Sequence, residues 1–261
     1  MIKIACAQMD MAFDKPDENF EAAKALIREA CKEAPDVVLL PETWNVGFFP
    51  KDTLNEHADL NCERVISEIG ALAKELNVNI VAGSVANSRD GIIYNTSVTF
   101  DREGSVVNVY DKTHLFSPMG EHLFFEKGNN VLRFSLDGFS CGVIICYDIR
   151  FPELTRSMSV NGLDFLFVVS QWPKVRIPQL KALLRARAIE NQCFAVCCNS
   201  CGKAGDTVYG GNSMIFDPLG ELLAEAGETQ KIISAECDTG GLEKIRNTIN
   251  VFRDRRPELY I

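Results

Sequence analysis

The chain of 261 residues lacks an apolar run long enough to span a membrane, and it has no excess of positive charge. Its 36 acidic residues outnumber its 27 lysines and arginines, which gives a net charge of −9 and an isoelectric point near 5.0. The densest basic stretch, Arg253-Asp254-Arg255-Arg256, is interrupted by an acid. We therefore expect neither a membrane protein nor a nucleic-acid-binding surface, because nucleic acids are bound by clustered cations.

The sequence also shows no secretory signal. Its first residues, Ile2-Lys3-Ile4-Ala5-Cys6, are typical of a strand and lack the charged start, apolar stretch and cleavage site of a signal peptide. The ten cysteines are scattered among strand-like segments, a distribution that favours free thiols over a disulfide framework. We expect a cytoplasmic protein.

One cysteine-rich stretch, Cys197-Cys198-Asn199-Ser200-Cys201, suggests a metal site. No second cysteine pair or nearby histidine completes a set of four ligands, and two adjacent cysteines on a strand point to opposite faces. We predict no metal site and no cofactor.

No Pro/Gly-rich linker or low-complexity segment divides the chain, so we expect one domain over residues 1–261, ending in a C-terminal tail. Hydrophobic periodicity predicts an alternation of strands and helices that is repeated in the second half. The predicted helices cover residues 17–33, 64–76, 152–160, 178–192 and 241–247. The predicted strands cover residues 2–8, 36–40, 80–85, 93–100, 105–110, 131–136, 140–145, 165–170, 194–199, 213–216, 221–225 and 231–236.

A short internal sequence repeat indicates that the chain has two similar halves. Residues 97–104 and 213–220 carry Ser, Phe, Asp and Gly at identical spacing, and each has an apolar strand that meets an Asp-x-x-Gly turn. This is the chemistry of a hairpin. Two α/β halves with matching hairpins predict two sheets packed face to face, with helices outside.

Three apolar strands each end in one reactive side chain. Val143-Ile144-Ile145 leads into Cys146, the strand at 36–40 is followed by Glu42, and the strand at 105–110 is followed by Lys112. A Pro-Glu pair after Cys146 predicts a helix start, whose partial positive charge favours a thiolate and a neighbouring oxyanion. The carboxyl ends of strands are where open α/β folds place their sites.

Each of these residues also has an ordinary interpretation. A buried cysteine can be inert, a glutamate after a strand is usually exposed, and a lysine is usually solvated. The three together, each after an apolar strand, favour a catalytic group. The irregular segments 45–60 and 117–130 follow Glu42 and Lys112, so we expect them to frame the pocket.

The chain resembles the nitrilase superfamily of carbon–nitrogen hydrolases along nearly its whole length. The matching motifs are Ile4-Ala5-Cys6-Ala7-Gln8, Leu39-Leu40-Pro41-Glu42, Tyr110-Asp111-Lys112-Thr113-His114-Leu115-Phe116, Cys146-Tyr147-Asp148-Ile149-Arg150-Phe151-Pro152-Glu153, Ala186-Arg187-Ala188-Ile189-Glu190-Asn191 and Gly211-Asn212-Ser213. The resemblance implies a four-layer αββα sandwich of two mixed β-sheets with helices outside, and a Glu–Lys–Cys triad.

Two further motifs, Met119-Gly120-Glu121-His122-Leu123 and Ser170-Gln171-Trp172-Pro173, are similar to the omega-amidase (2-oxoglutaramate amidase) branch. This resemblance implies an amidase that cleaves the carboxamide of a small carboxylate-bearing amide, such as an omega-amide of an α-keto acid. The expected partners are that amide and water.

The triad implied by the resemblance has a consistent chemistry. Glu42 takes the thiol proton, Cys146 attacks the carbonyl carbon, and Lys112 with the backbone N–H of Tyr147 stabilises the oxyanion. Ammonia leaves, and water hydrolyses the thioester. Glu121 matches a second glutamate of the family, expected to orient Lys112 or the substrate amide, the alternative being a surface loop residue.

The substrate-binding residues remain more open. Arg150 is expected to hold a substrate carboxylate or, equally, to form a structural ion pair with Asp148 or Glu153. An apolar wall is expected from Trp172, Phe48 and Phe49.

His114 raises the alternative of a Cys–His hydrolase, against the simpler prediction that it bonds to a loop backbone. A nitrilase, an N-carbamoyl amino acid hydrolase, transfer of the acyl group to another acceptor, and a non-catalytic binding protein on the same fold also stay open. The tail is expected to cross the interface of a homodimer, as the resemblance implies.

Overall fold

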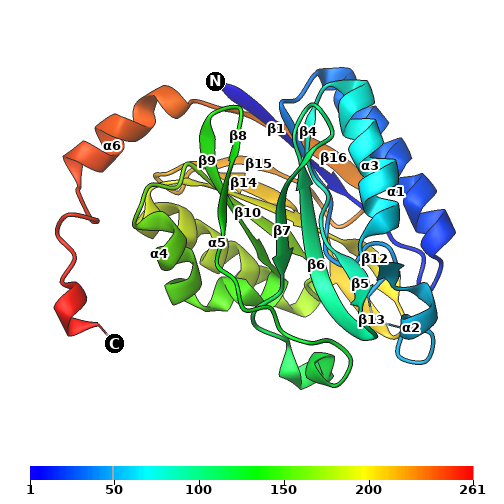
Figure 1. Ribbon diagram of the computed structural model, residues 1–261. Coiled ribbons are helices and arrows are strands. Elements are labelled where there is room, and N and C mark those ends of the chain that lie inside the picture. Colours follow the sequence, from blue (N-terminus) through cyan, green and yellow to red (C-terminus); the bar gives the residue numbers. More distant parts are fainter. Residues whose placement is uncertain (49, 261) are drawn as a thin grey trace.

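The computed structural model describes residues 1–48 and 50–260. Two β-sheets lie face to face between two pairs of helices (Figure 1). Helices α1 (Pro16–Ala30) and α3 (Glu63–Leu76) cover one sheet, and α4 (Pro152–Ser159) and α5 (Ile177–Asn191) cover the other. The predicted four-layer αββα sandwich is confirmed.

The first sheet has the strand order β16-β1-β2-β4-β6-β5-β3, with β7 also paired to β6. Its strands are β1 (Ile2–Gln8), β2 (Val37–Leu39), β3 (Asp59–Leu60), β4 (Asn79–Val81), β5 (Val85–Arg89), β6 (Ile92–Phe100), β7 (Val106–Asp111) and β16 (Lys231–Cys237). Strands β1, β2 and β4 are parallel to one another. Strand β16 pairs antiparallel with β1, and β5 and β7 each pair antiparallel with β6, so the sheet is mixed.

The second sheet has the order β15-β14-β11-β10-β9-β8 and is also mixed. Its strands are β8 (Arg133–Leu136), β9 (Phe139–Ile145), β10 (Phe165–Ser170), β11 (Phe194–Asn199), β14 (Met214–Phe216) and β15 (Leu222–Glu225). A separate hairpin joins β12 (Cys201–Ala204) to β13 (Thr207–Gly210).

Burial on both faces explains why the central strands are continuously apolar. In β10, Phe165, Phe167 and Val169 pack into the core between the sheets, whereas Leu166 and Val168 pack against the helices. Successive side chains of a strand alternate in direction, so a strand with two covered faces needs apolar residues at every position.

The hairpin predicted from the repeated Asp-x-x-Gly pattern is confirmed in both halves. Strands β6 and β7 pair antiparallel around Asp101, whose carboxylate accepts hydrogen bonds from the N–H groups of Glu103 and Ser105. Strands β14 and β15 pair in the same way around Asp217, with equivalent bonds from Leu219 and Glu221. The Asp-x-x-Gly spacing is therefore explained by the side chain that closes the turn.

Several elements differ from the prediction. The strand expected at 80–85 ends at Val81, and the chain turns at Gly83 before β5 begins. Helix α2 (Leu54–His57), β3 and the β12–β13 hairpin were not expected, because short elements leave little periodicity. Strand β16 pairs with β1, so the last strand of the second half joins the sheet of the first.

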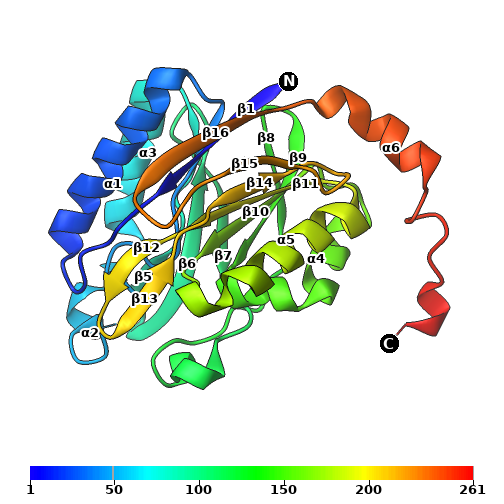
Figure 2. The same ribbon diagram turned by 180° about the vertical axis from the view of Figure 1, so that it is seen from behind.

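Helix α6 (Leu242–Thr248) and the tail run outward from the sandwich, as both views show (Figure 1, Figure 2). Across the residues that the structure describes, no helix has the length and apolar character needed to cross a membrane.

Gly83 provides a test of the turn that positions Glu42. Its φ is +60°, and an added Cβ would lie 1.9 Å from the carbonyl oxygen of Pro41. Gly91 also has a positive φ, +76°, but an added Cβ meets nothing within 4 Å. We predict that Gly91→Ala lowers the free energy of unfolding by about 1 kcal/mol, the cost of the left-handed conformation alone.

Gly83→Ala should instead lower it by about 3 kcal/mol or more, because backbone atoms must move as well. Urea denaturation of the two variants measures the difference. Equal losses would contradict the proposed steric role of Gly83.

Candidate active site

The three reactive strand ends meet between the sheets. Glu42 follows β2, Lys112 follows β7, and Cys146 follows β9, so the first sheet supplies the ion pair and the second sheet supplies the thiol. The Lys112 Nζ donates to Glu42 Oε1 over 2.8 Å, and Cys146 lies close enough to both groups for their charges to shift the pKa of its thiol. Both charged side chains are almost fully buried, at 2% and 4% exposure.

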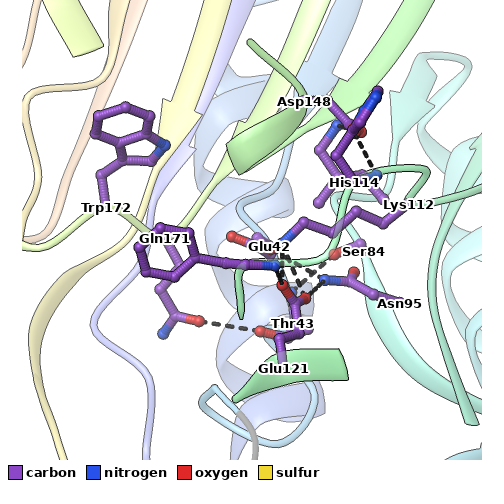
Figure 3. A network of polar contacts seen from close by, with 12 residues as sticks. Glu42, Thr43, Ser84, Asn95, Lys112, His114, Glu121, Asp148, Gln171 and Trp172 are labelled. Atoms are coloured by element: carbon purple, nitrogen blue, oxygen red, sulfur yellow. Dashed lines mark hydrogen bonds and ion pairs between the residues drawn. The ribbon is translucent and has the colours of Figure 1, made fainter. Parts of the chain in front are cut away.

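Glu121 completes this network, shown in Figure 3. Its two carboxylate oxygens lie 2.8 and 2.9 Å from Lys112 Nζ, and Asn95 Nδ2 donates to both Glu42 and Glu121. Glu121 Oε2 also accepts the backbone N–H of Phe116 at 2.6 Å. Glu121 is buried, so the alternative of a surface loop glutamate is wrong; its direct contact is with Lys112.

Backbone geometry after β2 holds Glu42 in place. Thr43 has a φ of 40°, and its N–H donates to Ser84 Oγ at 2.9 Å. The Thr43 hydroxyl donates to Gln171 Oε1 at 3.0 Å, and the N–H of Glu42 lies 3.4 Å from the carbonyl oxygen of Ser170. These last two contacts cross from one sheet to the other, beside the triad.

Cys146 occupies a sharp turn. Its φ is 50°, and a 3₁₀ helix over Cys146–Arg150 follows it before α4 begins at Pro152. The predicted helix therefore starts six residues after the cysteine, with a tighter turn between them.

Asp148, which is fully buried, fixes this turn. Its carboxylate accepts the N–H of Ile145 at 3.0 Å, the hydroxyl of Tyr110 at 2.8 Å and the N–H of His114 at 2.9 Å. The turn that carries the thiol is thus tied to the segment around Lys112.

The protonation states follow from burial and charge. Burial raises the pKa of Glu42 above its ordinary value of 4.5. Burial, together with the Glu42 charge, raises the pKa of the Cys146 thiol well above 9.0 despite the nearby ammonium of Lys112. The charge expected from the following helix start is therefore outweighed, and Cys146 rests as a thiol beside a carboxylate, the state from which Glu42 is expected to take the proton. Burial alone would lower the pKa of Lys112, but Glu121 and Glu42 outweigh it and hold this pKa well above 10.5.

A pocket opens over the thiol, with about 440 Å³ of empty space when the open solvent at its mouth is included. The predicted residues Tyr147, Arg150, Trp172 and Phe48 all line it. The described lining residues are Glu42, Phe48, Lys112, Phe116, Met119, Glu121, Cys146, Tyr147, Arg150, Gln171, Trp172, Pro173 and Arg176. The last candidate for the apolar wall, Phe49, lies outside the described residues.

Arg150 contacts an aromatic ring rather than an acid. Its Cζ lies 4.9 Å from the centroid of the Trp172 ring. Among the residues that the structure describes, Arg150 forms no ion pair, and the Asp148 carboxylate is already bonded to backbone and side-chain donors. The structural ion pair with Asp148 or Glu153 is therefore not formed.

His114 does not bond to a loop backbone as expected. Its Nδ1 lies 2.8 Å from Asp148 Oδ1, and its ring stacks on Phe151 at 3.7 Å between centroids. The ring does not line the pocket beside Cys146. In this position His114 supports the turn that carries Cys146. The contacts give no basis for a catalytic pair of Cys146 and His114.

Sequence patterns missed Asn95, Asp148 and Arg176 as members of the site. Asn95 lies inside an ordinary strand pattern, and Arg176 lies 30 residues from Cys146 in a segment without a strand end. Cys197 and Cys198 face opposite cores, as strand alternation predicted. Within residues 1–48 and 50–260, no group of three or more His, Cys, Asp or Glu side chains is arranged to hold a metal.

Comparison with known proteins identifies the family. The family model for carbon–nitrogen hydrolase matches residues 3–247. The chain is 42% identical over 257 residues to a 2-oxoglutaramate amidase of Bacillus subtilis (strain 168), covering 98% of each protein. It is 38% identical over 261 residues to the protein named hydrolase in agr operon of Staphylococcus aureus, covering 99% of this chain and 100% of that protein.

A solved structure agrees with these similarities. The fold superposes on Saccharomyces cerevisiae Nit3, a member of branch 10 of the nitrilase superfamily, with a TM-score of 0.90 and 28% identity, covering 98% of this chain and 96% of Nit3. The resemblance found in the sequence is thereby confirmed: the chain belongs to the carbon–nitrogen hydrolase family and is a hydrolytic enzyme.

Proposed function

We propose that this enzyme is an amidase that hydrolyses the carboxamide of a small carboxylate-bearing amide, such as the omega-amide 2-oxoglutaramate, with release of ammonia. The observation that carries the proposal is the buried Glu42–Lys112 ion pair, which lines one pocket together with Cys146 and Arg150. The name of the Bacillus subtilis relative supports the choice of substrate.

Catalysis begins with proton transfer. Glu42 accepts the proton of the Cys146 thiol as sulfur attacks the amide carbon, and the carbonyl electrons move onto oxygen. Lys112 and the N–H of Tyr147 donate to this oxyanion. Because the pKa of Lys112 stays well above its ordinary value, the ammonium remains charged and acts as an electrostatic donor.

The intermediate then collapses. Glu42 delivers its proton to the amide nitrogen, the C–N bond breaks, and ammonia leaves a thioester on Cys146. Glu42 next takes a proton from water as the water oxygen attacks the thioester. The C–S bond breaks, Glu42 returns the proton to sulfur, and the free acid leaves. Glu121 is the positioning residue of this cycle, since it contacts Lys112 through both oxygens.

The other end of the substrate lies toward Arg150, Trp172 and Phe48. A guanidinium suits a carboxylate because it can donate two parallel hydrogen bonds. The rings of Trp172 and Phe48 form an apolar wall beside the methylene groups of the substrate.

The pH dependence of the reaction should report Glu42. Its pKa is raised above 4.5 by burial, so the carboxylate is protonated, and unable to accept the thiol proton, at a pH where an ordinary glutamate is still ionised. We predict that kcat/KM rises with pH through a midpoint above 4.5. Circular dichroism at each pH controls for unfolding, and a profile that stays level down to pH 4.5 would contradict the role of Glu42 as the base.

The substrate class is tested by ammonia release from a panel of amides, nitriles and N-carbamoyl amino acids. We expect carboxylate-bearing amides to be cleaved with the highest kcat/KM, and Cys146→Ala to abolish their turnover. Cys31→Ala is the matched control, because Cys31 is a partly exposed thiol outside the pocket. A preference for nitriles or carbamoyl compounds, or full activity in Cys146→Ala, would refute the proposal.

Assembly and location complete the proposal. We propose that residues 1–261 act as one domain whose tail crosses to a second copy in a cytoplasmic homodimer; the outward course of α6 and the tail supports this (Figure 2). Light scattering should give twice the chain mass of 29.0 kDa, and a monomer mass at assay concentration would refute the assembly.

A further inference from the structure

Asn95 bridges the two carboxylates of the site with one amide group. Its Nδ2 lies 3.0 Å from Glu42 Oε1 and 3.2 Å from Glu121 Oε1 (Figure 3). Lys112 Nζ binds the same two oxygens, each at 2.8 Å. Two donors therefore alternate with two acceptors in a closed ring, in which one donor is charged and the other is neutral.

The orientation of this amide is unfavourable for its own oxygen. Asn95 is 1% exposed, and its Oδ1 has no hydrogen-bond partner among the described residues. A buried acceptor without a donor costs free energy, so packing alone would favour an apolar side chain at this position. The opposite orientation would point Oδ1 at the two carboxylates, which repel it. What Asn95 contributes to the site is therefore its pair of N–H groups.

The backbone of Asn95 is fixed from both sides. The residue lies within β6, where it faces Ala86 of the neighbouring strand β5. On the other side, its carbonyl accepts the N–H of Lys112 at 2.9 Å. Residues on paired strands hold a site more precisely than loop residues do. Asn95 thus positions the lysine through its main chain and both glutamates through its side chain.

The two carboxylates are held unequally. Glu121 Oε1 accepts bonds from Lys112 and Asn95. Glu121 Oε2 accepts a second bond from Lys112 and one from the N–H of Phe116. On Glu42, in contrast, Lys112 and Asn95 both bind Oε1, and neither binds Oε2. This asymmetry leaves Glu42 Oε2 as the oxygen best suited to carry a proton.

We propose that Asn95 is a positioning residue that, together with Lys112, fixes Glu42 through Oε1 and leaves Oε2 to exchange the proton with Cys146. This inference rests on the proposed amidase function, in which Glu42 is the base, and adds a residue and an atom to it. The amide also acts on charge. A donor to a carboxylate stabilises the ionised form, so removing the donor raises the pKa of the carboxyl group.

The other groups around Glu42 do not titrate in the relevant range. They are Lys112 after β7, Glu121, Cys146 after β9, Cys197 on β11, Tyr209 on β13, and the pocket arginines Arg150 and Arg176. Burial raises the pKa of all three of Cys146, Cys197 and Tyr209, so they stay protonated below pH 9.0. The pKa of Lys112 stays well above 10.5, because burial, which would lower it, is outweighed by the two glutamates. A midpoint below pH 9.0 therefore reports the carboxylates that Asn95 binds.

The test compares Asn95→Leu with the matched control Asn87→Leu. Asn87 lies on β5 and is also 1% exposed, but its side chain bonds to Thr96 Oγ1 and the N–H of Cys62 instead of the carboxylates. Asn95→Leu should raise the midpoint of the kcat/KM profile by about one pH unit and lower kcat by about 10- to 100-fold, as expected for a lost donor to a charged group. KM should change far less, because Asn95 is not among the described residues that line the pocket.

Alkylation of Cys146 by iodoacetamide gives a second profile that needs no turnover. Sulfur displaces iodide from the reagent, and the thiol proton passes to Glu42. The rate, measured on the peptide that contains Cys146, should rise with pH through the same midpoint as kcat/KM, and Asn95→Leu should move both midpoints upward together. Asn87→Leu should lower the free energy of unfolding but leave both midpoints in place. Because alkylation is independent of the amide substrate, this profile decides the inference even where the proposed substrate is refuted.

An unchanged midpoint in Asn95→Leu, an equal shift in Asn87→Leu, or a loss confined to KM would overturn the inference and leave the amidase function standing. Failure of the wild type to release ammonia from any carboxylate-bearing amide would instead overturn the proposed function. If Asn95→Leu does not fold, Asn95→Ala and Asn87→Ala replace the pair, since alanine removes the amide without adding a branched side chain to the core. The midpoint must then still rise in Asn95→Ala, and an unchanged midpoint would overturn the role of Asn95.

Discussion

The structure of the site depends on one buried ammonium group. Lys112 Nζ lies within 2.9 Å of oxygens from both Glu42 and Glu121, and all three side chains are at most 5% exposed. Removing such charges from water costs several kcal/mol per ion, so none of the three is stable there without the others. Burial of the thiol, together with the charge of Glu42, keeps the proton on the Cys146 sulfur despite the nearby ammonium.

The four-layer fold is what brings these groups together. Glu42 and Lys112 follow strands of the first sheet and Cys146 follows a strand of the second, so the face-to-face packing of two sheets creates the site. Strained backbone conformations at Thr43 and Cys146 then orient the side chains of the site. Thr43 and Cys146 both have positive φ values, and such conformations persist only where the surroundings enforce them. Asp148 and Ser84 provide that enforcement through hydrogen bonds to the backbone.

Sequence patterns predicted the layers and the triad because both depend on local signals. Continuous apolar runs identify buried strands, and Glu42, Lys112 and Cys146 each stand where such a run ends. Other features depend on contacts between distant segments, and no local pattern records them. The pairing of β16 with β1 joins residues more than 200 positions apart. Asn95 on β6 donates to Glu42, which follows β2, although β4 lies between these two strands.

Protonation was the least predictable property. The sequence places a helix start after Cys146, which favours a thiolate, but the burial of the thiol and the charge of Glu42 outweigh that contribution. Arg176 was missed for a related reason. Its contact with Phe116 is made by a turn between β10 and α5, and nothing in the sequence around Arg176 distinguishes it from a solvated arginine.

The central claim is that Cys146 carries the acyl group during turnover. Rapid acid quenching during hydrolysis of a slow amide substrate, followed by intact-mass measurement and peptide mapping, tests this claim most directly. The account predicts a mass increase equal to the acyl group, located on the peptide that contains Cys146 and absent in Cys146→Ala. An acyl group on another residue, or continued turnover by the Cys146→Ala variant, would contradict it.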